Sequence, residues 1–183
     1  MSDSQTSRRP YGGNTRAAWL ATATGIPIYT ALTAIVWGPA VALYSSIADD
    51  PEASVDTPAL GVIAAVSILV VVVGIAAVAH TVGRVVFART DDAELGKAAV
   101  AFGAMAALLA LVPVVLIAIG QDETWAAAAA AIIIVLVPCT LTSAATRAML
   151  PSVDRFSALR STMVVLLVIA LIGVVVFTFY AFV

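Results

Sequence analysis

The sequence predicts an all-α integral membrane protein, a bundle of five transmembrane helices with its N-terminus in the cytoplasm and its C-terminus outside. Three observations lead to this class. Of the 183 residues, 62% are hydrophobic and 11% charged, against about half and about a quarter in soluble domains. Five apolar runs each reach the roughly 20 residues needed to cross a hydrocarbon core of about 30 Å. The third observation is that the charged residues between these runs alternate in sign.

The basic residues are confined to alternate sides of the apolar runs. The segment before the first run and two of the four gaps hold all nine bases: Arg8, Arg9, Arg16, Arg84, Arg89, Lys97, Arg147, Arg155 and Arg160. The other two hold only acids: Asp49, Asp50, Glu52, Asp56, Asp122 and Glu123. Loops rich in Lys and Arg stay in the cytoplasm during insertion. The alternation therefore predicts five crossings that begin inside and end outside.

Residues 1–15 lack any apolar period and are predicted to form a disordered cytoplasmic tail. Residues 16–183 are predicted to form one membrane domain. Its five predicted spans are 17–47, 58–88, 92–119, 125–145 and 161–183.

Local signals justify the first three spans. The first is longer than a perpendicular helix requires, so it should tilt, and Pro27 and Pro39 should bend it. Pro58 after a threonine opens the second span. The sequence from Asp91 to Glu94 matches a capping box and places the start of the third span near Asp92.

A cap residue and the span length support the last two predicted spans. Asp122 is the expected cap of the fourth span. The fifth has 23 residues at about 1.5 Å each, or about 34 Å, which is just enough to cross. It ends in an aromatic cluster expected at the outer interface, formed by Phe177, Phe179, Tyr180 and Phe182.

Charges also recur at an offset of 63 residues. Arg84 then aligns with Arg147, and Lys97 with Arg160. One explanation is a duplicated helical hairpin, as in transporters built from repeats. The other is that bilayer thickness and short loops force similar intervals on any hairpin. The sequence leaves both open.

The middle of each predicted span lacks Asp, Glu, Lys and Arg. Proton pumps, ion-coupled carriers and voltage sensors need such groups, so the pattern argues against a self-contained pump or antiporter. One histidine, His80, cannot give a haem two axial ligands from one chain. No Gly-rich phosphate loop or nucleophile motif is present. We therefore expect no catalytic residues, no metal, no cofactor and no enzyme activity from this chain alone.

A semi-polar set nevertheless falls in the predicted cytoplasmic half of the spans. His80 and Arg84, four residues apart, should share one helix face. Pro138 frees the carbonyl of Ile134, close to Cys139 and Thr142. The candidate ligand-binding residues are therefore His80, Arg84, Cys139 and Thr142, around a pocket open to the cytoplasm. The alternative is structural, since membrane Ser and Thr often bond back to their own helix.

The sequence favours an accessory or assembly subunit of a larger membrane complex. The alternative is a small transport component that binds a substrate and works with an energising partner. An enzyme acting on lipid-linked substrates fits least well. The expected partners are the lipid bilayer and other membrane-protein subunits, and no nucleic acid. The Arg-rich, Ala-rich composition indicates a multi-pass protein of a prokaryotic plasma membrane.

Overall fold

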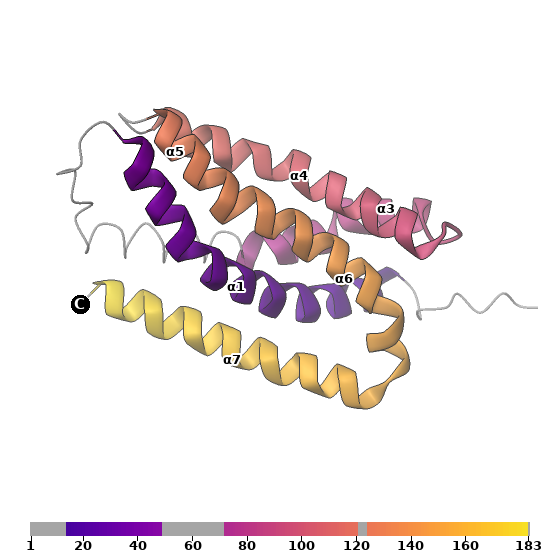
Figure 1. Cartoon of the computed structure of the whole chain (residues 1–183). Coiled ribbons are helices and arrows are strands. Elements are labelled where there is room, and N and C mark those ends of the chain that lie inside the picture. Colours follow the sequence, from indigo (N-terminus) through magenta and orange to yellow (C-terminus); the bar gives the residue numbers. More distant parts are fainter. Residues whose placement is uncertain (1–13, 49–71, 121–123, 183) are drawn as a thin grey trace, which may run out of the picture.

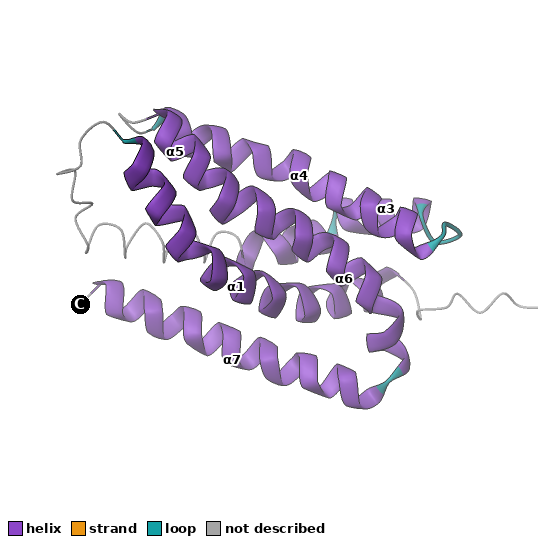
Figure 2. Cartoon of the chain, viewed as in Figure 1, coloured by secondary structure: helices purple, strands orange, loops and turns teal. Residues whose placement is uncertain are grey.

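A computed structural model of the chain describes residues 14–48, 72–120 and 124–182, and every regular element in these ranges is a helix (Figures 1 and 2). The labelled helices are α1 (Asn14–Ile47), α3 (Val82–Arg89), α4 (Leu95–Ile119), α5 (Thr124–Ala131), α6 (Val137–Arg155) and α7 (Ser157–Phe182). A helical segment over Val72–His80 leads into α3, and a π-helix, η1 (Ile132–Leu136), joins α5 to α6.

Within these ranges, four helices are long and apolar enough to cross a membrane: α1, α4, the continuous α5–η1–α6 helix and α7. The segment Val72–His80 and α3 make a fifth if this bent pair is one span. The prediction of an all-helical protein with several spans is confirmed at this level.

The helix boundaries differ from the predicted spans mainly at the charged ends. The fourth predicted span stops at 145, yet α6 continues to Arg155. The continuation is stabilised by Leu150 and Val153, which are 2% and 1% exposed and pack into the bundle. Helix α4 begins at Leu95 rather than 92, and α7 begins at Ser157 rather than 161. Residues 58–71 of the second span, and 1–13 of the predicted tail, lie outside the described residues.

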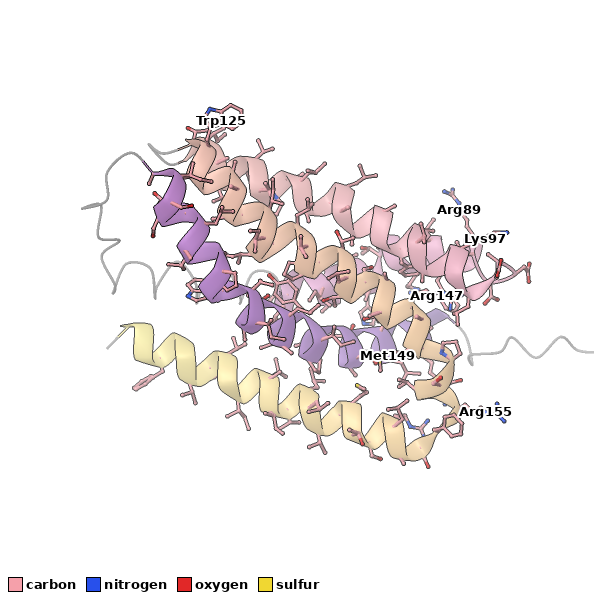
Figure 3. All side chains as sticks on the ribbon, viewed as in Figure 1. Arg89, Lys97, Trp125, Arg147, Met149 and Arg155 are labelled. Carbon is pink, nitrogen blue, oxygen red and sulfur yellow. The ribbon has the colours of Figure 1, made fainter. Side chains whose placement is uncertain are left out.

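Consecutive long helices run in opposite directions, so their ends gather at two faces of the bundle (Figure 1). The start of α1, α4 and α7 and the end of α3 and α6 lie at one of them. Figure 3 shows Arg89, Lys97, Arg147 and Arg155 at this end and Trp125 at the other. An ion pair of 2.7 Å between Arg16 and Asp154 joins α1 to α6 here. We call this face the basic end.

The centre of the bundle is formed by α1, α4 and α6. The most extensive contact joins α4 to α6, and the next joins α1 to α6. Glycines allow these helices to approach closely, the usual basis of helix association in membranes. A Cβ added at Gly103 on α4 would lie 3.5 Å from the Cβ of Ala144 on α6. A Cβ added at Gly25 on α1 would lie 3.4 Å from both Ile75 and Thr146.

Helix α7 covers the outside of this group, along α1 and α6 (Figure 1). Its Met163, Ala170 and Val174 face inward and are buried, whereas most of its large side chains are exposed. An apolar exposed face of this length is suited to contact with lipid tails.

Two helices of the bundle depart from a straight course. The axis of α1 changes direction between its halves (Figure 1), as Pro27 and Pro39 predicted. The predicted second span is bent by 47° between Val72–His80 and α3. The first turn of α3, directly after this bend, needs glycine at position 83, because a Cβ there would lie 2.9 Å from the carbonyl oxygen of Val78.

The close approach of α4 to α6 predicts a disulfide between two introduced cysteines, because their Cβ separation falls within the usual range of about 3.5–4.5 Å. In a Cys139→Ser background, Gly103→Cys with Ala144→Cys should crosslink almost fully on mild oxidation. The control pair, Gly96→Cys with Ala144→Cys, should not, since a Cβ at Gly96 has no neighbour within 4 Å. Non-reducing electrophoresis after cleavage at a protease site inserted between 120 and 124 separates the outcomes. Equal crosslinking of both pairs would contradict this packing.

Candidate ligand cavity

A cavity of about 270 Å³ lies between α1, the bent pair, α4 and α6. It extends from the basic end toward the middle of the bundle, where Pro113 and Val135 contribute to its wall. Most of the wall is apolar, and includes Ala17, Ala21, Val78, Phe87, Phe102, Met105 and Leu109. The polar part is formed by Arg84, Cys139, Thr142, Ser143, Thr146 and Arg147.

Five of these six polar residues come from one face of α6. Side chains three and four residues apart share a face of an α-helix. Positions 139, 142, 143, 146, 147 and 150 follow this spacing, and all of them line the cavity. Apart from Arg84 on α3, the polar wall is therefore a single stripe on α6 that ends in Arg147.

A change in backbone geometry precedes this stripe. The π-helix η1 ends just before Pro138, and the amide of Val137 donates to the carbonyl of Ile132, five residues back. Proline has no amide proton and clashes with the preceding turn of an α-helix. A π-bulge relieves that clash, and such bulges are frequent at functional sites. Pro138 therefore shapes the wall of the cavity next to Val135 and Cys139.

The Arg147 side chain, only 4% exposed, ties three elements together. Its guanidinium carbon lies 5.0 Å from the ring centre of Phe87 on α3 and 5.9 Å from that of Phe102 on α4. Its Nη2 donates a long hydrogen bond of 3.4 Å to the carbonyl of Thr90, just after α3. Aromatic faces and the carbonyls at the end of a helix both favour a cation.

These contacts leave part of the guanidinium without a partner. Neither Nε nor Nη1 of Arg147 has a hydrogen-bond partner within the described part of the protein. The same holds for the hydroxyls of Thr142 and Thr146, which lie on the same stripe. Arg84 adds a second guanidinium to the lining, and no Asp or Glu is among the described residues that line the cavity. The polar wall thus offers hydrogen-bond donors and positive charge.

Several other Thr hydroxyls donate to a carbonyl of their own helix, as the structural alternative predicts. Thr22 donates to Ala18 at 3.0 Å, Thr81 to Ala77 at 2.7 Å and Thr140 to Leu136 at 2.8 Å, each four residues back. Ser and Thr side chains in membrane helices often bond back in this way. Thr142 and Thr146 differ, because their hydroxyls make no such bond.

The structure brings three of the four candidate residues to the cavity and leaves the fourth aside. Arg84, Cys139 and Thr142 line it, whereas His80 does not. His80 instead contacts the indole of Trp19 edge to face, with ring centres 4.7 Å apart. The helix break at Thr81 separates His80 from Arg84, so they do not continue one regular helix face.

Sequence reasoning missed Arg147, which was interpreted only as a residue that sets topology. A signal was present, because the spacing of Cys139, Thr142, Ser143, Thr146 and Arg147 places all five on one helix face. Ending the fourth span at 145 concealed that pattern. No three His, Cys, Asp or Glu side chains are grouped to hold a metal ion in the ranges that the structure describes.

Comparison of the chain with protein-family models, with curated proteins and with solved structures gave no match. Its class therefore follows from its own features. It is a multi-pass helical membrane protein with an apolar cavity inside its helix bundle.

Filling the cavity should stabilise the fold. Ala106 on α4 lines the cavity, whereas Ala104 on the same helix is exposed. We expect Ala106→Leu to raise the free energy of unfolding by about 0.5–2 kcal/mol, the usual gain from filling a cavity. Ala104→Leu should change it by less than about 0.5 kcal/mol. Thermal unfolding in mild detergent measures both, and a loss of several degrees with Ala106→Leu would show that the space is absent.

Proposed function

We propose that this chain is the ligand-binding membrane component of a small transport system, and that it works with partner subunits. The observation that carries the proposal is the cavity, whose apolar wall ends in a donor-rich stripe on α6. Small-molecule sites usually combine an apolar lining with a few convergent polar groups. Cys139, Thr142 and Arg84 are proposed as ligand contacts, together with Arg147.

Movement of a ligand would require energy from elsewhere. Ion-coupled carriers use acidic or titratable groups inside the membrane. Among the described residues, the ionisable groups of the cavity wall are Arg84, Arg147 and Cys139, with no carboxylate. An energising partner, or an existing concentration gradient, is therefore part of the proposal.

The accessory or assembly subunit is the second candidate, and one observation favours it. Helix α7 packs along α1, α6 and the segment Val72–His80, and it leaves a long apolar face exposed. A partner helix could dock on this face, since membrane helices associate through extended packing surfaces. In that case the chain would contribute stability to a complex rather than hold a ligand.

For orientation, we propose that the basic end faces the cytoplasm of a prokaryotic cell and that the C-terminus lies outside. The clustering of Arg16, Arg89, Lys97 and Arg155 at one end of the bundle supports this, because basic loops remain inside. Arg147 lies eight residues before Arg155, about 12 Å along the helix. The polar stripe would then lie in the cytoplasmic half of the membrane.

Cysteine labelling tests this orientation in a Cys139→Ser background. Ala93→Cys lies in the turn before α4, and Thr124→Cys lies at the start of α5, at the opposite end. An impermeant maleimide added to intact cells should label Thr124→Cys and spare Ala93→Cys. Both should react in opened membranes. Labelling of Ala93→Cys alone in intact cells would reverse the proposed topology.

Purification from the native membrane distinguishes the two functions. The tagged chain, extracted in mild detergent, should retain a small molecule at near one-to-one stoichiometry by mass spectrometry of the intact complex. Ala106→Trp should displace it by filling the cavity, whereas the matched variant Ala104→Trp, on the exposed side of α4, should retain it. Retention of stoichiometric protein subunits and no small molecule would instead favour the accessory subunit.

A further inference from the structure

The positive charge of Arg147 at the cavity wall has no acidic partner among the described residues. Only 4% of the Arg147 residue is exposed, and the described residues form no ion pair with its guanidinium. Arginine remains protonated in proteins and can only donate hydrogen bonds. Burial of a charge is strongly unfavourable unless the charge is paired and hydrogen-bonded.

The protein satisfies only one side of this guanidinium. Nη2 reaches the carbonyl of Thr90, and the rings of Phe87 and Phe102 lie against the cation. Nε and Nη1 have no partner among the described residues. A purely structural arginine would be expected to use these two nitrogens as well, because buried polar groups are nearly always hydrogen-bonded.

The neighbouring polar groups point to the same chemistry. The hydroxyls of Thr142 and Thr146 are buried, have no hydrogen-bond partner among the described residues and can donate, and both lie on the stripe that ends at Arg147. Arg84 adds a second positive charge. A ligand group that accepts several hydrogen bonds and carries negative charge, such as a carboxylate or a phosphate, complements this set.

The remaining wall is complementary to a hydrocarbon. Away from the stripe, and apart from Arg84, the lining consists of Ala, Val, Leu, Ile, Met, Phe, Pro and Gly residues. A cavity of about 150 Å³ holds benzene, with six carbons. In proportion, the 270 Å³ of this cavity corresponds to a ligand of about eleven non-hydrogen atoms, which leaves about eight carbons for the tail once a carboxylate is included.

We propose that the cavity binds an anionic amphiphile, with its carboxylate or phosphate head on Arg147 and an apolar tail of about eight carbons along α4. Thr142 and Thr146 donate to the same head group, and Arg84 adds attraction from α3. This inference rests on the proposed ligand-binding function and specifies its substrate class. A free fatty acid and a lipid phosphate share the required chemistry.

Photoreactive probes with one tail and different heads test the proposal. The full chain is placed in nanodiscs of zwitterionic phosphatidylcholine and irradiated with diazirine-bearing decanoate, decyl phosphate or decanol. Labelled peptides are then located by mass spectrometry. At least one anionic probe should label the cavity peptides at concentrations about tenfold below those needed for decanol, as expected for charge-assisted hydrogen bonds. Preference for decanoate or for decyl phosphate identifies the source of the head group.

Variants assign the preference to Arg147. Arg147→Gln should reduce the difference between anionic probe and decanol to less than about twofold, while decanol labelling itself stays unchanged and reports an intact cavity. Arg147→Lys should restore part of the preference. Arg155→Gln is the matched control on the same helix, since Arg155 is exposed, and should keep the full preference. If Arg147→Gln does not fold, Thr146→Val, which preserves the side-chain shape, should weaken anionic labelling severalfold.

The outcomes separate this inference from the function on which it rests. Equal labelling of the cavity by all three probes would overturn the anionic ligand and leave a ligand-binding cavity in place. No labelling of cavity peptides by any probe in the folded chain would overturn both. An anionic preference that survives Arg147→Gln would also overturn the assignment to Arg147.

Discussion

The burial of one guanidinium connects the elements that matter most in this bundle. Arg147 projects from α6 between the rings of Phe87 and Phe102 and reaches the carbonyl of Thr90. In doing so it holds α3, the turn after α3, α4 and α6 in register at the basic end. The same contacts exclude it from solvent, so a charge that would be unremarkable at a surface becomes the main electrostatic feature of the interior. The cavity and the positioning of α3 both depend on this arrangement.

Small residues allow the central helices to pack closely enough for this arrangement. Where Gly103 meets Ala144, α4 and α6 approach closely, and Gly25 allows α1 to approach both Ile75 and Thr146. In lipid, such packing replaces the hydrophobic effect as the force that joins helices. The cavity lies at the same level as these contacts, since Phe102, Ser143 and Thr146 are among the residues that line it.

Backbone irregularities surround the same space. The bend at Thr81 turns α3 toward Arg147, and the π-helix η1 displaces the wall before Pro138. Non-ideal backbone inside a membrane protein is tolerated where it is buried in protein or lines a cavity. Helix α7, by contrast, is regular and largely exposed, as expected of a helix that faces lipid. The proposed roles of these parts differ accordingly: a binding interior, and an outer face suited to lipid or to a partner subunit.

The sequence by itself determined the fold class and the positions of the long helices. It could do so because a crossing helix needs about 20 apolar residues whatever surrounds it. It also identified three of the residues that line the cavity, Arg84, Cys139 and Thr142, because polar groups are rare in such helices. It did not identify Arg147 as an interior residue, since a basic residue just beyond an apolar run usually lies at the interface. Only the tertiary structure decided that, because the continuation of α6 to Arg155 and the rings contributed by α3 and α4 bury the side chain, and no spacing within one helix encodes those contacts.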